Sequence, residues 1–422
     1  MADTGSSAAV MTTSDGIPLK VSLQRALRRS RRRAFFLVLP LLAFLTISFV
    51  LPIFDMLFRS VDNTIVPQNL PSVVKAIEDW DPKASELPSE AVYEAMVKDI
   101  QIGFEEKTLG SLARRLNYDL TGSASLFRKS GRRASKIEGA PYKEQLIEVD
   151  EDWGDPAIWN LIKRESDSLT ASYFLSAVDM RYDEQGDIAM QPDYQQIYLK
   201  LFWRTLVISA VITGLCILLG YPVAYLMATL PLRSSNLLMI LVLLPFWTSL
   251  LVRTTAWIAL LQTQGVLNDL LVAVGVISDD GRIRMIYNQT GTIVAMTHIL
   301  LPFMILPLYS VMKTIPPSYM RAARSMGANP FTAFVRVYMP NTVAGVGAGS
   351  ILCFILAIGY YITPALVGGQ SGTLISNFIA NHISVTLNWG LAAALGVILL
   401  GLVMLLYVIY DRIVGIDNMK LG

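Results

Sequence analysis

The sequence contains few of the residues that build metal and nucleophilic sites. It has only two cysteines and two histidines in 422 residues, which excludes a disulfide framework and the ligand spacing of a zinc site. Cys216 and Cys353 lie inside apolar runs, where a small buried side chain is the expected role. His298 and His382 are far apart in the sequence, and no Ser/His/Asp or Cys/His pattern emerges. We therefore expect no hydrolytic enzyme.

Charge is also scarce. Charged residues make up 16% of the chain and hydrophobic residues 53%, whereas charged residues form about 25% of ordinary soluble domains. The mean hydropathy is +0.48, and a soluble protein this apolar would expose large hydrophobic patches to water. A net charge of +2 gives no case for a nucleic-acid partner. The composition predicts a membrane protein.

Six apolar stretches are long enough to cross about 30 Å of hydrocarbon. They cover residues 34–58, about 201–227, 237–261, about 292–312, 343–367 and 391–410. Each must be helical, because lipid offers no partner for an unpaired backbone amide. The sequence therefore predicts an all-α membrane protein with six transmembrane helices.

The positions of basic residues predict the orientation of these spans. Six arginines lie between Arg25 and Arg33, just before the first span, so residues 1–33 are expected to form a cytoplasmic basic tail. Six spans return the C-terminal tail, residues 416–422, to the same side. A cleaved signal peptide is the alternative for the N-terminal segment, but its apolar run of about 25 residues lacks a small-x-small cleavage signal and favours a retained anchor.

Residues 59–200 differ from the rest in composition, since they are rich in charge and acidic on balance. The topology places them outside, so we interpret them as an α-rich extracytoplasmic domain inserted between the first two spans. A helix that follows Ser89, a second helix over 156–175 and a hairpin turn over 180–190 are expected within it. The first of these helices is expected to carry an apolar stripe of Val92, Met96, Ile100 and Phe104. The acidic cluster at 148–155 misses the EF-hand spacing, which favours a solvated acidic face over a calcium site.

The loop between the fourth and fifth spans, residues 315–340, has the most informative pattern. A Pro-Pro pair ends one element, and Ser318 can cap a short helix after it. Gly327 can end that helix in a left-handed conformation, and Pro330 can open a second helix. These residues predict two short helices with a tight bend at the inner membrane surface. The shape suits a groove in another protein, and an interfacial connector between spans is the plain alternative.

The same loop resembles the "EAA" loop of ABC importer permeases, in its Ala-Ala pair, the following glycine and the Met-Pro pair about a dozen residues later. In that family the loop forms the coupling helix that docks into the ATP-binding subunit. The resemblance implies an ATPase-coupling set made of Arg321, Ala322, Ala323, Gly327, Ala328 and Pro330. The family has a glutamate at the head of the loop, and Arg321 reverses that charge.

The resemblance extends from about Phe202 to Asp411. The segments 245–257, 265–268 and 359–369 are similar to those of spermidine/putrescine-type permeases. Aromatic faces suit a cationic solute, and the candidate substrate-path residues are Trp247, Arg253, Trp257, Tyr360 and Tyr361. Tyr360 and Ala365 stand where some polyamine permeases have acidic residues, so the solute stays open between a polyamine-like compound and an opine-like or amino-acid-like one. Arg253 has a second interpretation, in which it extends toward lipid headgroups.

The family implies a type I ABC importer permease fold, with a core over residues 201–415, in a bacterial inner membrane. It also implies a second permease subunit, a periplasmic solute-binding protein above and ATPase subunits below. The chain has no Gly-Lys dipeptide and hence no Walker A motif. ATP and Mg²⁺ are therefore expected on the partner ATPase, with no cofactor and no catalytic residue in this chain. Gly345, Gly347 and Gly349 have the spacing of close helix packing, expected within the permease dimer.

Two other classes of protein remain as alternatives. A membrane receptor or sensor would use residues 59–200 to bind a ligand, although the sequence has no cytoplasmic output domain. A channel would transport without nucleotide, so ATP dependence of uptake separates it from an importer.

Overall fold

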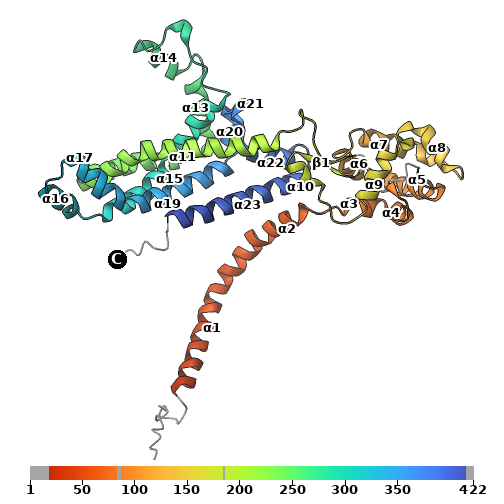
Figure 1. The fold of residues 1–422 in the computed structure, drawn as a ribbon, viewed down its shortest axis with the longest axis horizontal. Helices are drawn as coiled ribbons and strands as arrows, with labels where there is room; N and C mark the ends of the chain where they lie inside the picture. Colours follow the sequence, from red (N-terminus) through yellow and green to blue (C-terminus); the bar gives the residue numbers. More distant parts are fainter. Residues whose placement is uncertain (1–18, 83–86, 184–185, 415–422) are drawn as a thin grey trace, which may run out of the picture. The chain divides into compact units, whose positions relative to one another are not determined.

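The computed structural model describes residues 19–82, 87–183 and 186–414. The chain divides into two compact units, Met1–Phe58 and Arg59–Gly422, and both are mainly helical (Figure 1). Of the two expected cytoplasmic tails, residues 1–18 and 416–422 lie outside the described residues.

The first unit consists of one long helical segment. It comprises α1 (Leu19–Leu45), a π-helical turn η1 (Thr46–Val50) and the start of α2 (Leu51–Arg59). Residues Leu27–Arg59 are long and apolar enough to span a membrane, and none of the most apolar stretch is buried within the structure. The first apolar stretch is therefore helical as expected, but the helix starts at Leu19 and includes the arginines before it.

The segment from residue 59 to residue 200 folds around its own hydrophobic core. Its helices are α3 (Ile65–Asn69), α4 (Pro71–Ala76), α5 (Glu90–Glu105), α6 (Leu109–Asn117), α7 (Ser123–Arg133), η3 (Ala134–Lys136), α8 (Tyr142–Val149), η4 (Glu151–Gly154), α9 (Pro156–Arg164) and α10 (Ser172–Ala177). Tyr93, Trp153 and Trp159 are fully buried at the centre of this core. Their rings lie 4.7 Å (Tyr93–Trp159) and 5.4 Å (Trp153–Trp159) apart between centroids.

Several local expectations for this segment can be compared with the structure. The stripe on α5 is confirmed for Val92, Met96 and Ile100, whereas Phe104 is 49% exposed. The single helix expected over 156–175 is wrong, because α9 ends at Arg164 and α10 begins at Ser172. The hairpin is confirmed, with β1 (Met180–Tyr182) antiparallel to β2 (Ile188–Met190).

Two residues of the acidic cluster have a local structural role. The carboxylate of Asp155 caps the start of α9 by accepting from the amide of Ala157, and Asp150 accepts from the amide of Asp152. Such caps pair backbone amides that a helix start leaves without partners.

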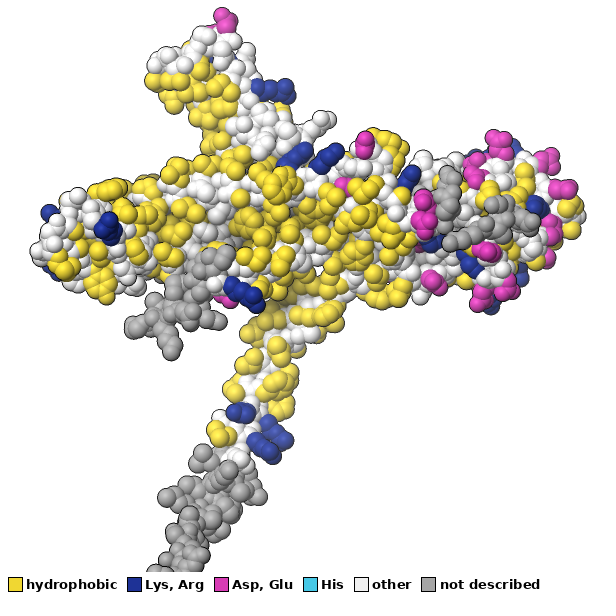
Figure 2. All heavy atoms as spheres, in the orientation of Figure 1, with side chains coloured by type: hydrophobic (Ala, Val, Ile, Leu, Met, Phe, Trp, Pro, Cys, Tyr) yellow, Lys and Arg dark blue, Asp and Glu magenta, His cyan; other side chains and the backbone are white. Residues whose placement is uncertain are grey.

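The remainder of the second unit is the helical core. Its long helices are α11 (Tyr198–Thr229), α15 (Gln289–Thr314), α19 (Val343–Gly359) and α23 (Trp389–Val414). Its shorter elements are α12 (Leu232–Leu243), η5 (Leu244–Trp247), α13 (Leu250–Leu261), α14 (Val266–Ala273), η6 (Asp279–Gly281), α16 (Pro317–Ser325), α17 (Pro330–Ala333), η7 (Phe334–Tyr338), α18 (Met339–Asn341), α20 (Ile362–Val367), α21 (Gly369–Gly372) and α22 (Ile375–Ser384). Hydrophobic side chains cover most of the surface of the long helices, whereas acidic side chains gather on the segment that carries α5–α9 (Figure 2).

The helices α11, α15 and α19 pack side by side (Figure 1). Cys216 and Cys353 are buried between them, and each thiol donates to a carbonyl of α15, that of Thr297 and that of Leu300. A Cβ atom on Gly345 would lie 3.1 Å from Cα of Leu308 in α15. The expectation that this glycine packs within a permease dimer is therefore wrong, because it packs against a helix of its own chain.

Four helical segments are individually long and apolar enough to cross a membrane, and two bent pairs bring the number to six if each pair is one span. The second, fourth and sixth expected spans correspond to α11, α15 and α23. The third is not one helix, because Leu232–Trp247 and Leu250–Ala273 meet at a 98° bend. The fifth is broken as well, since α19 ends at Gly359 and α20 starts at Ile362.

The segment before residue 200 contacts the helical core at the start of α23. The ring of Tyr173 in α10 lies so close to Gly390 that a Cβ atom there would approach it to 2.3 Å. The hydroxyl of Tyr118 donates to the carbonyl of Thr386 at 2.9 Å. These contacts tie the end of α6 to the loop between α22 and α23, and α10 to the first turn of α23.

Candidate functional site

The loop between α15 and α19 forms two short helices at one end of the helical core (Figure 1). The first, α16, begins at Pro317 with Pro316 at its N-cap, so the expected cap at Ser318 is wrong. A proline fits the first helical turn because that turn needs no intrahelical amide donor. The second, α17, begins at Pro330 as expected, and the side chain of Asn329 accepts from the amide of Thr332 at 2.7 Å.

The bend between the helices depends on one glycine. Gly327 has a φ of +92°, which confirms the expected left-handed conformation. The amide of Ala328 donates to the carbonyl of Ala323 at 3.1 Å, and the amide of Gly327 to that of Arg324 at 3.0 Å. This is the Schellman arrangement, which pairs carbonyls that a helix end leaves free. The bend is therefore set by backbone hydrogen bonds as well as by sequence.

The six residues of the expected coupling set lie together on this bend but differ in burial. Ala323 is buried against the helical core, with 4% of its surface exposed. Ala328 is half-buried, and the other four members, Arg321, Ala322, Gly327 and Pro330, are exposed. The loop thus presents one small residue inward and a mixed surface outward.

Aromatic rings anchor the second half of the loop to the long helices. The ring of Tyr225 in α11 lies edge-on to Phe334 at 5.3 Å and to Tyr338 at 5.2 Å between centroids. Phe334 and Tyr338 stack on each other at 5.6 Å. The hydroxyls of Tyr221 and Thr342 lie 3.1 Å apart. Sequence reasoning missed this anchor, whose only signal is the aromatic spacing 334/338 facing 221/225.

The candidate path residues fall into two groups. Trp257, in α13, donates its indole N–H to Nδ1 of His298 in α15 at 3.1 Å. Arg253 lies one turn earlier in the same helix. Two of the five path candidates, Arg253 and Trp257, thus lie one turn apart on α13. Trp247, at the bend between α12 and α13, is 76% exposed, and Tyr361 is 47% exposed.

The backbone at Tyr360 and Tyr361 is held by distant side chains. Ser376 donates its hydroxyl to the carbonyl of Tyr360 at 2.6 Å, and Asn377 donates its amide to that of Tyr361 at 2.7 Å. These bonds satisfy carbonyls that the break between α19 and α20 exposes. Among the described residues, Nε of Arg253 is buried and has no hydrogen-bond partner. A buried guanidinium nitrogen without a partner is costly, so a hydrogen-bond acceptor bound beside Arg253 would supply the partner that it lacks.

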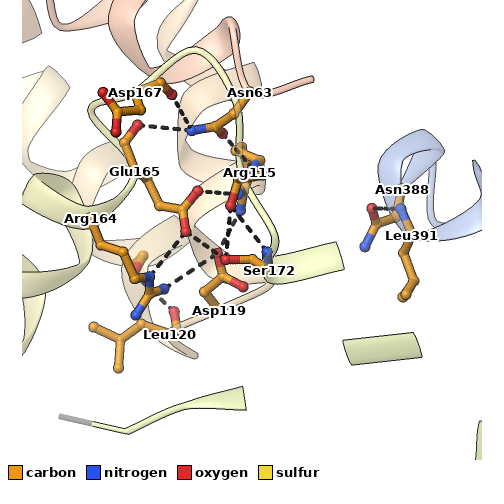
Figure 3. Close-up of polar contacts among 12 residues, drawn as sticks. Asn63, Arg115, Asp119, Leu120, Arg164, Glu165, Asp167, Ser172, Asn388 and Leu391 are labelled. Atoms are coloured by element: carbon orange, nitrogen blue, oxygen red, sulfur yellow. Dashed lines mark hydrogen bonds and ion pairs between the residues drawn. The ribbon is translucent and has the colours of Figure 1, made fainter. Parts of the chain in front are cut away.

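A buried ionic cluster in the segment before residue 200 was not expected from the sequence (Figure 3). Arg115 pairs with Glu165 and with Asp119, each at 2.6 Å, and its Nε donates to Oδ1 of Asn63 at 3.0 Å. The hydroxyl of Ser172 donates to Glu165 at 2.7 Å. The participants are spread from residue 63 to residue 172, so no local motif signals the cluster.

Electrostatics shift the pKa values within this cluster. Burial is the largest influence on Asp119 and raises the pKa of its carboxyl, partly offset by Arg115. Burial alone would lower the pKa of Arg115, but Asp119, Tyr173 and Glu165 together raise it above its ordinary value. Because each charge has opposite charges and hydrogen bonds around it, we interpret the cluster as structural.

Residues 217–415 match the family described as binding-protein-dependent transport system inner membrane component. The chain is 35% identical over 227 residues to the spermidine/putrescine transport system permease protein PotB of Haemophilus influenzae, covering 54% of this chain and 79% of the relative. It is 35% identical over 214 residues to PotB of Escherichia coli, covering 50% of this chain and 77% of that protein.

A solved structure gives a weaker likeness. A bacterial ABC transporter involved in the import of the acidic polysaccharide alginate aligns with a TM-score of 0.43 and 18% identity, over 53% of this chain and 80% of that chain. The identity to the two PotB proteins and the match over the helical core establish the family. This chain belongs to the inner-membrane permease subunits of ABC importers, in the spermidine/putrescine branch.

Proposed function

We propose that this permease subunit forms, with a second and related permease subunit, the path by which a small polar solute enters the cell. A polyamine is the favoured solute, because the two PotB relatives are spermidine/putrescine permeases and this chain aligns with 79% and 77% of their lengths. An opine-like or amino-acid-like solute is the alternative. Transport is by alternating access, driven by ATP on separate ATPase subunits and supplied by a periplasmic solute-binding protein.

The observation that carries this proposal is the bend at Gly327. Two short helices joined by a Schellman bend give a compact projection between α15 and α19, and the aromatic anchor ties that projection to α11. A push on α16 is therefore passed to three packed helices at once. Such rigid connection is what coupling of ATP hydrolysis to the movement of spans requires.

The same proposal fixes the topology. Both termini and the loop that carries α16 lie in the cytoplasm, and residues 59–200 lie in the periplasm, as the excess of basic residues near the inner span ends indicates. Residues 59–200 contain 25 of the 33 acidic residues of the chain. An acidic segment of this kind concentrates cationic solutes near the entrance by long-range attraction.

For the path, we propose Trp257 and Tyr360, with Trp247 and Tyr361, as residues that meet a polyamine, and Arg253, whose guanidinium only donates hydrogen bonds, as the contact for the carboxylate of an amino-acid-like solute. Aromatic faces attract ammonium groups, and His298 holds the indole of Trp257 in place. The described core has no carboxylate from residue 281 to residue 410, so aromatic faces would carry most of the recognition of a cation there.

The test begins with mild-detergent purification of the tagged chain from its host and mass spectrometry of the proteins that accompany it. A second permease and an ATPase with a Walker A motif are expected. The assembly is then reconstituted in liposomes, and uptake of radiolabelled spermidine, putrescine and an amino acid is measured with ATP, without ATP and with a non-hydrolysable analogue.

Uptake of a polyamine that requires hydrolysable ATP supports the proposal. Uptake that is equal with and without ATP would identify a channel instead. Trp257→Ala is expected to reduce polyamine uptake while the ATPase still accompanies the chain, whereas Trp203→Ala, on an indole that is 70% exposed in α11, is the matched control and should leave uptake unchanged.

A further inference from the structure

We propose that α16 docks in a groove of the ATPase subunit that has an acidic wall on one side and an apolar wall on the other. This inference rests on the proposed function, in which the loop that carries α16 meets an ATPase. It adds the chemistry of the partner's surface, which is opposite in charge to what a glutamate at the head of the loop would select.

The outward face of α16 has three parallel strips. At 3.6 residues per turn, Ser318, Ala322 and Ser325 share one strip, which lies opposite the half-buried Met320 and the buried Ala323. All three are small and exposed, so they let another backbone approach closely. A strip of small residues is what a helix needs to enter a groove without steric conflict.

The two flanks of this strip differ in chemistry. Arg321 and Arg324, three residues apart, lie along one side, and both are exposed. Tyr319 and Met326 lie along the other side, with 48% and 82% of their surfaces exposed. A helix with one cationic and one apolar flank fits a groove in one orientation only, because the reverse orientation would place arginine against the apolar wall.

Within the part of the chain that the structure describes, no carboxylate is paired with the positive charge on this face. The sequence has no aspartate or glutamate from residue 281 to residue 410. Among the described residues, neither Arg321 nor Arg324 takes part in a salt bridge. The same end of the core also carries Lys313 and Arg336, which are exposed. A partner surface with carboxylates at this position therefore complements the charge of the described face.

The apolar flank favours a protein over a lipid surface as the partner. It continues past the bend onto Phe331 of α17, whose side chain is 76% exposed. Phosphate headgroups could pair with the two arginines. They would not need the strip of small residues that lies between the arginines and Met326. A protein groove uses all three strips at once, since apolar anchors and close packing dominate the energy of such interfaces.

The test compares assembly of the intact transporter in three forms: wild type, Arg321→Glu and Arg233→Glu. Arg233 is exposed at the start of α12 and lies outside α16, so its variant makes the same charge change as a matched control. We expect Arg321→Glu to lower the amount of ATPase recovered per permease about tenfold, and Arg233→Glu to leave it unchanged. Size-exclusion profiles of the permease verify that each variant is intact.

A second measurement locates the carboxylate. Both native cysteines are buried, so Ala322→Cys introduces a singly exposed thiol that can be cross-linked to the ATPase. An aspartate or glutamate found beside the cross-linked peptide is then changed to arginine, and this change is expected to restore assembly with Arg321→Glu. Restoration by charge exchange is a result that general destabilisation does not produce.

Other outcomes overturn the inference in distinguishable ways. Equal recovery of ATPase with Arg321→Glu and with the wild type would contradict the acidic wall. It would not contradict the proposed importer function. A loss that vanishes in nanodiscs without anionic lipid assigns the arginine to headgroups. Absence of any ATPase with the wild-type chain contradicts the proposed function itself.

Discussion

At the scale of the residue, Gly327 is required because its backbone is left-handed, and not because a side chain would lack room. Its φ is +92°, and a Cβ atom built on it would meet nothing within 4 Å. A side chain there is therefore strained only by the left-handed conformation, which costs about 1–2 kcal/mol for an ordinary residue. That cost falls on the bend that joins α16 to α17.

We predict that Gly327→Leu uncouples ATP hydrolysis from uptake while membrane insertion stays intact. Gly327→Asn should keep more of the coupling, because asparagine tolerates the left-handed region better than leucine. Uptake and phosphate release by reconstituted variants check this, with Gly401→Leu as control, since that glycine is also open but lies in regular helix. Wild-type uptake per ATP from Gly327→Leu would count against a coupling role for the bend.

Tyr93 gives a prediction about alkaline stability at the same scale. Burial raises its pKa to about 12, and its hydroxyl donates to the carbonyl of Trp153 at 2.8 Å. The folded state therefore keeps the phenol protonated, while the unfolded chain ionises near pH 10. The stabilisation from Tyr93 is complete below about pH 10 and is lost as the pH rises toward about 12.

Tyr93→Phe is expected to flatten the fall of stability between about pH 10 and about pH 12, by about 3 kcal/mol at the upper end. At neutral pH the same variant should lose only about 1 kcal/mol, because the carbonyl of Trp153 still accepts from the indole of Trp159. Thermal unfolding followed by tryptophan fluorescence across this range measures both effects. Parallel curves for the two proteins would show that Tyr93 ionises freely in the fold.

At the scale of the element, the close approach of α19 to α15 depends on Gly345. A Cβ atom there would lie 3.1 Å from Cα of Leu308 and 3.2 Å from the carbonyl oxygen of Pro307. Both are backbone atoms, which cannot move aside as a flexible side chain can. We predict that Gly345→Leu separates the two helices and destabilises the protein by about 3 kcal/mol.

Gly359→Leu is the matched control, since Gly359 ends the same helix and a Cβ atom there would meet nothing within 4 Å. Thermal unfolding in detergent compares the two variants with the wild type. Equal melting temperatures for all three would mean that α15 and α19 tolerate a larger separation than the structure has.

The elements also show how far the sequence predicts this fold. Long uninterrupted apolar runs suffice for α11, α15 and α23, because a run of that length has no other stable form in lipid. The breaks after Trp247 and Gly359 were not predicted. The second break is held by Ser376 and Asn377, which donate to the carbonyls of Tyr360 and Tyr361, and a pairing between such distant residues leaves no local pattern.

The candidate site was predictable to a similar extent. The bend at Gly327 and the start of α17 at Pro330 follow from turn chemistry within a few residues. The cap of α16 was misplaced, because Ser318 competes with two prolines for the same position and the structure starts the helix at Pro317. The hydrogen bond between Trp257 and His298 joins two helices that are distant in the sequence, so it could not be predicted from a local pattern.

At the scale of the whole molecule, residues 59–200 can be separated in function from the loop that carries α16. Their main hydrophobic core is separate from that of the long helices, although Tyr173 and Ala177 belong to a smaller cluster shared with α11, α22 and α23. Their contacts with the rest of the second unit include the hydrogen bond of Tyr118 to Thr386 and the packing of α10 on α23 at Gly390. The proposed ATPase contact lies in α16, which packs mainly against α17 and η7 among the described elements.

Deletion of residues 65–195 therefore distinguishes an importer from a sensor. An importer lacking this segment should still recover its ATPase in full, because α16, α17 and the aromatic anchor remain. Its uptake should fall by less than about tenfold, as expected when attraction at the entrance is lost but the path is kept. A sensor should instead lose its response to solute completely, since the segment would be its ligand-binding domain.

The double variant Tyr118→Phe with Tyr173→Leu is the control that loosens the contact without removing the segment. If the deletion abolished ATPase recovery while this control kept it, residues 59–200 would be needed for assembly of the transporter, and the separation of function proposed here would be wrong.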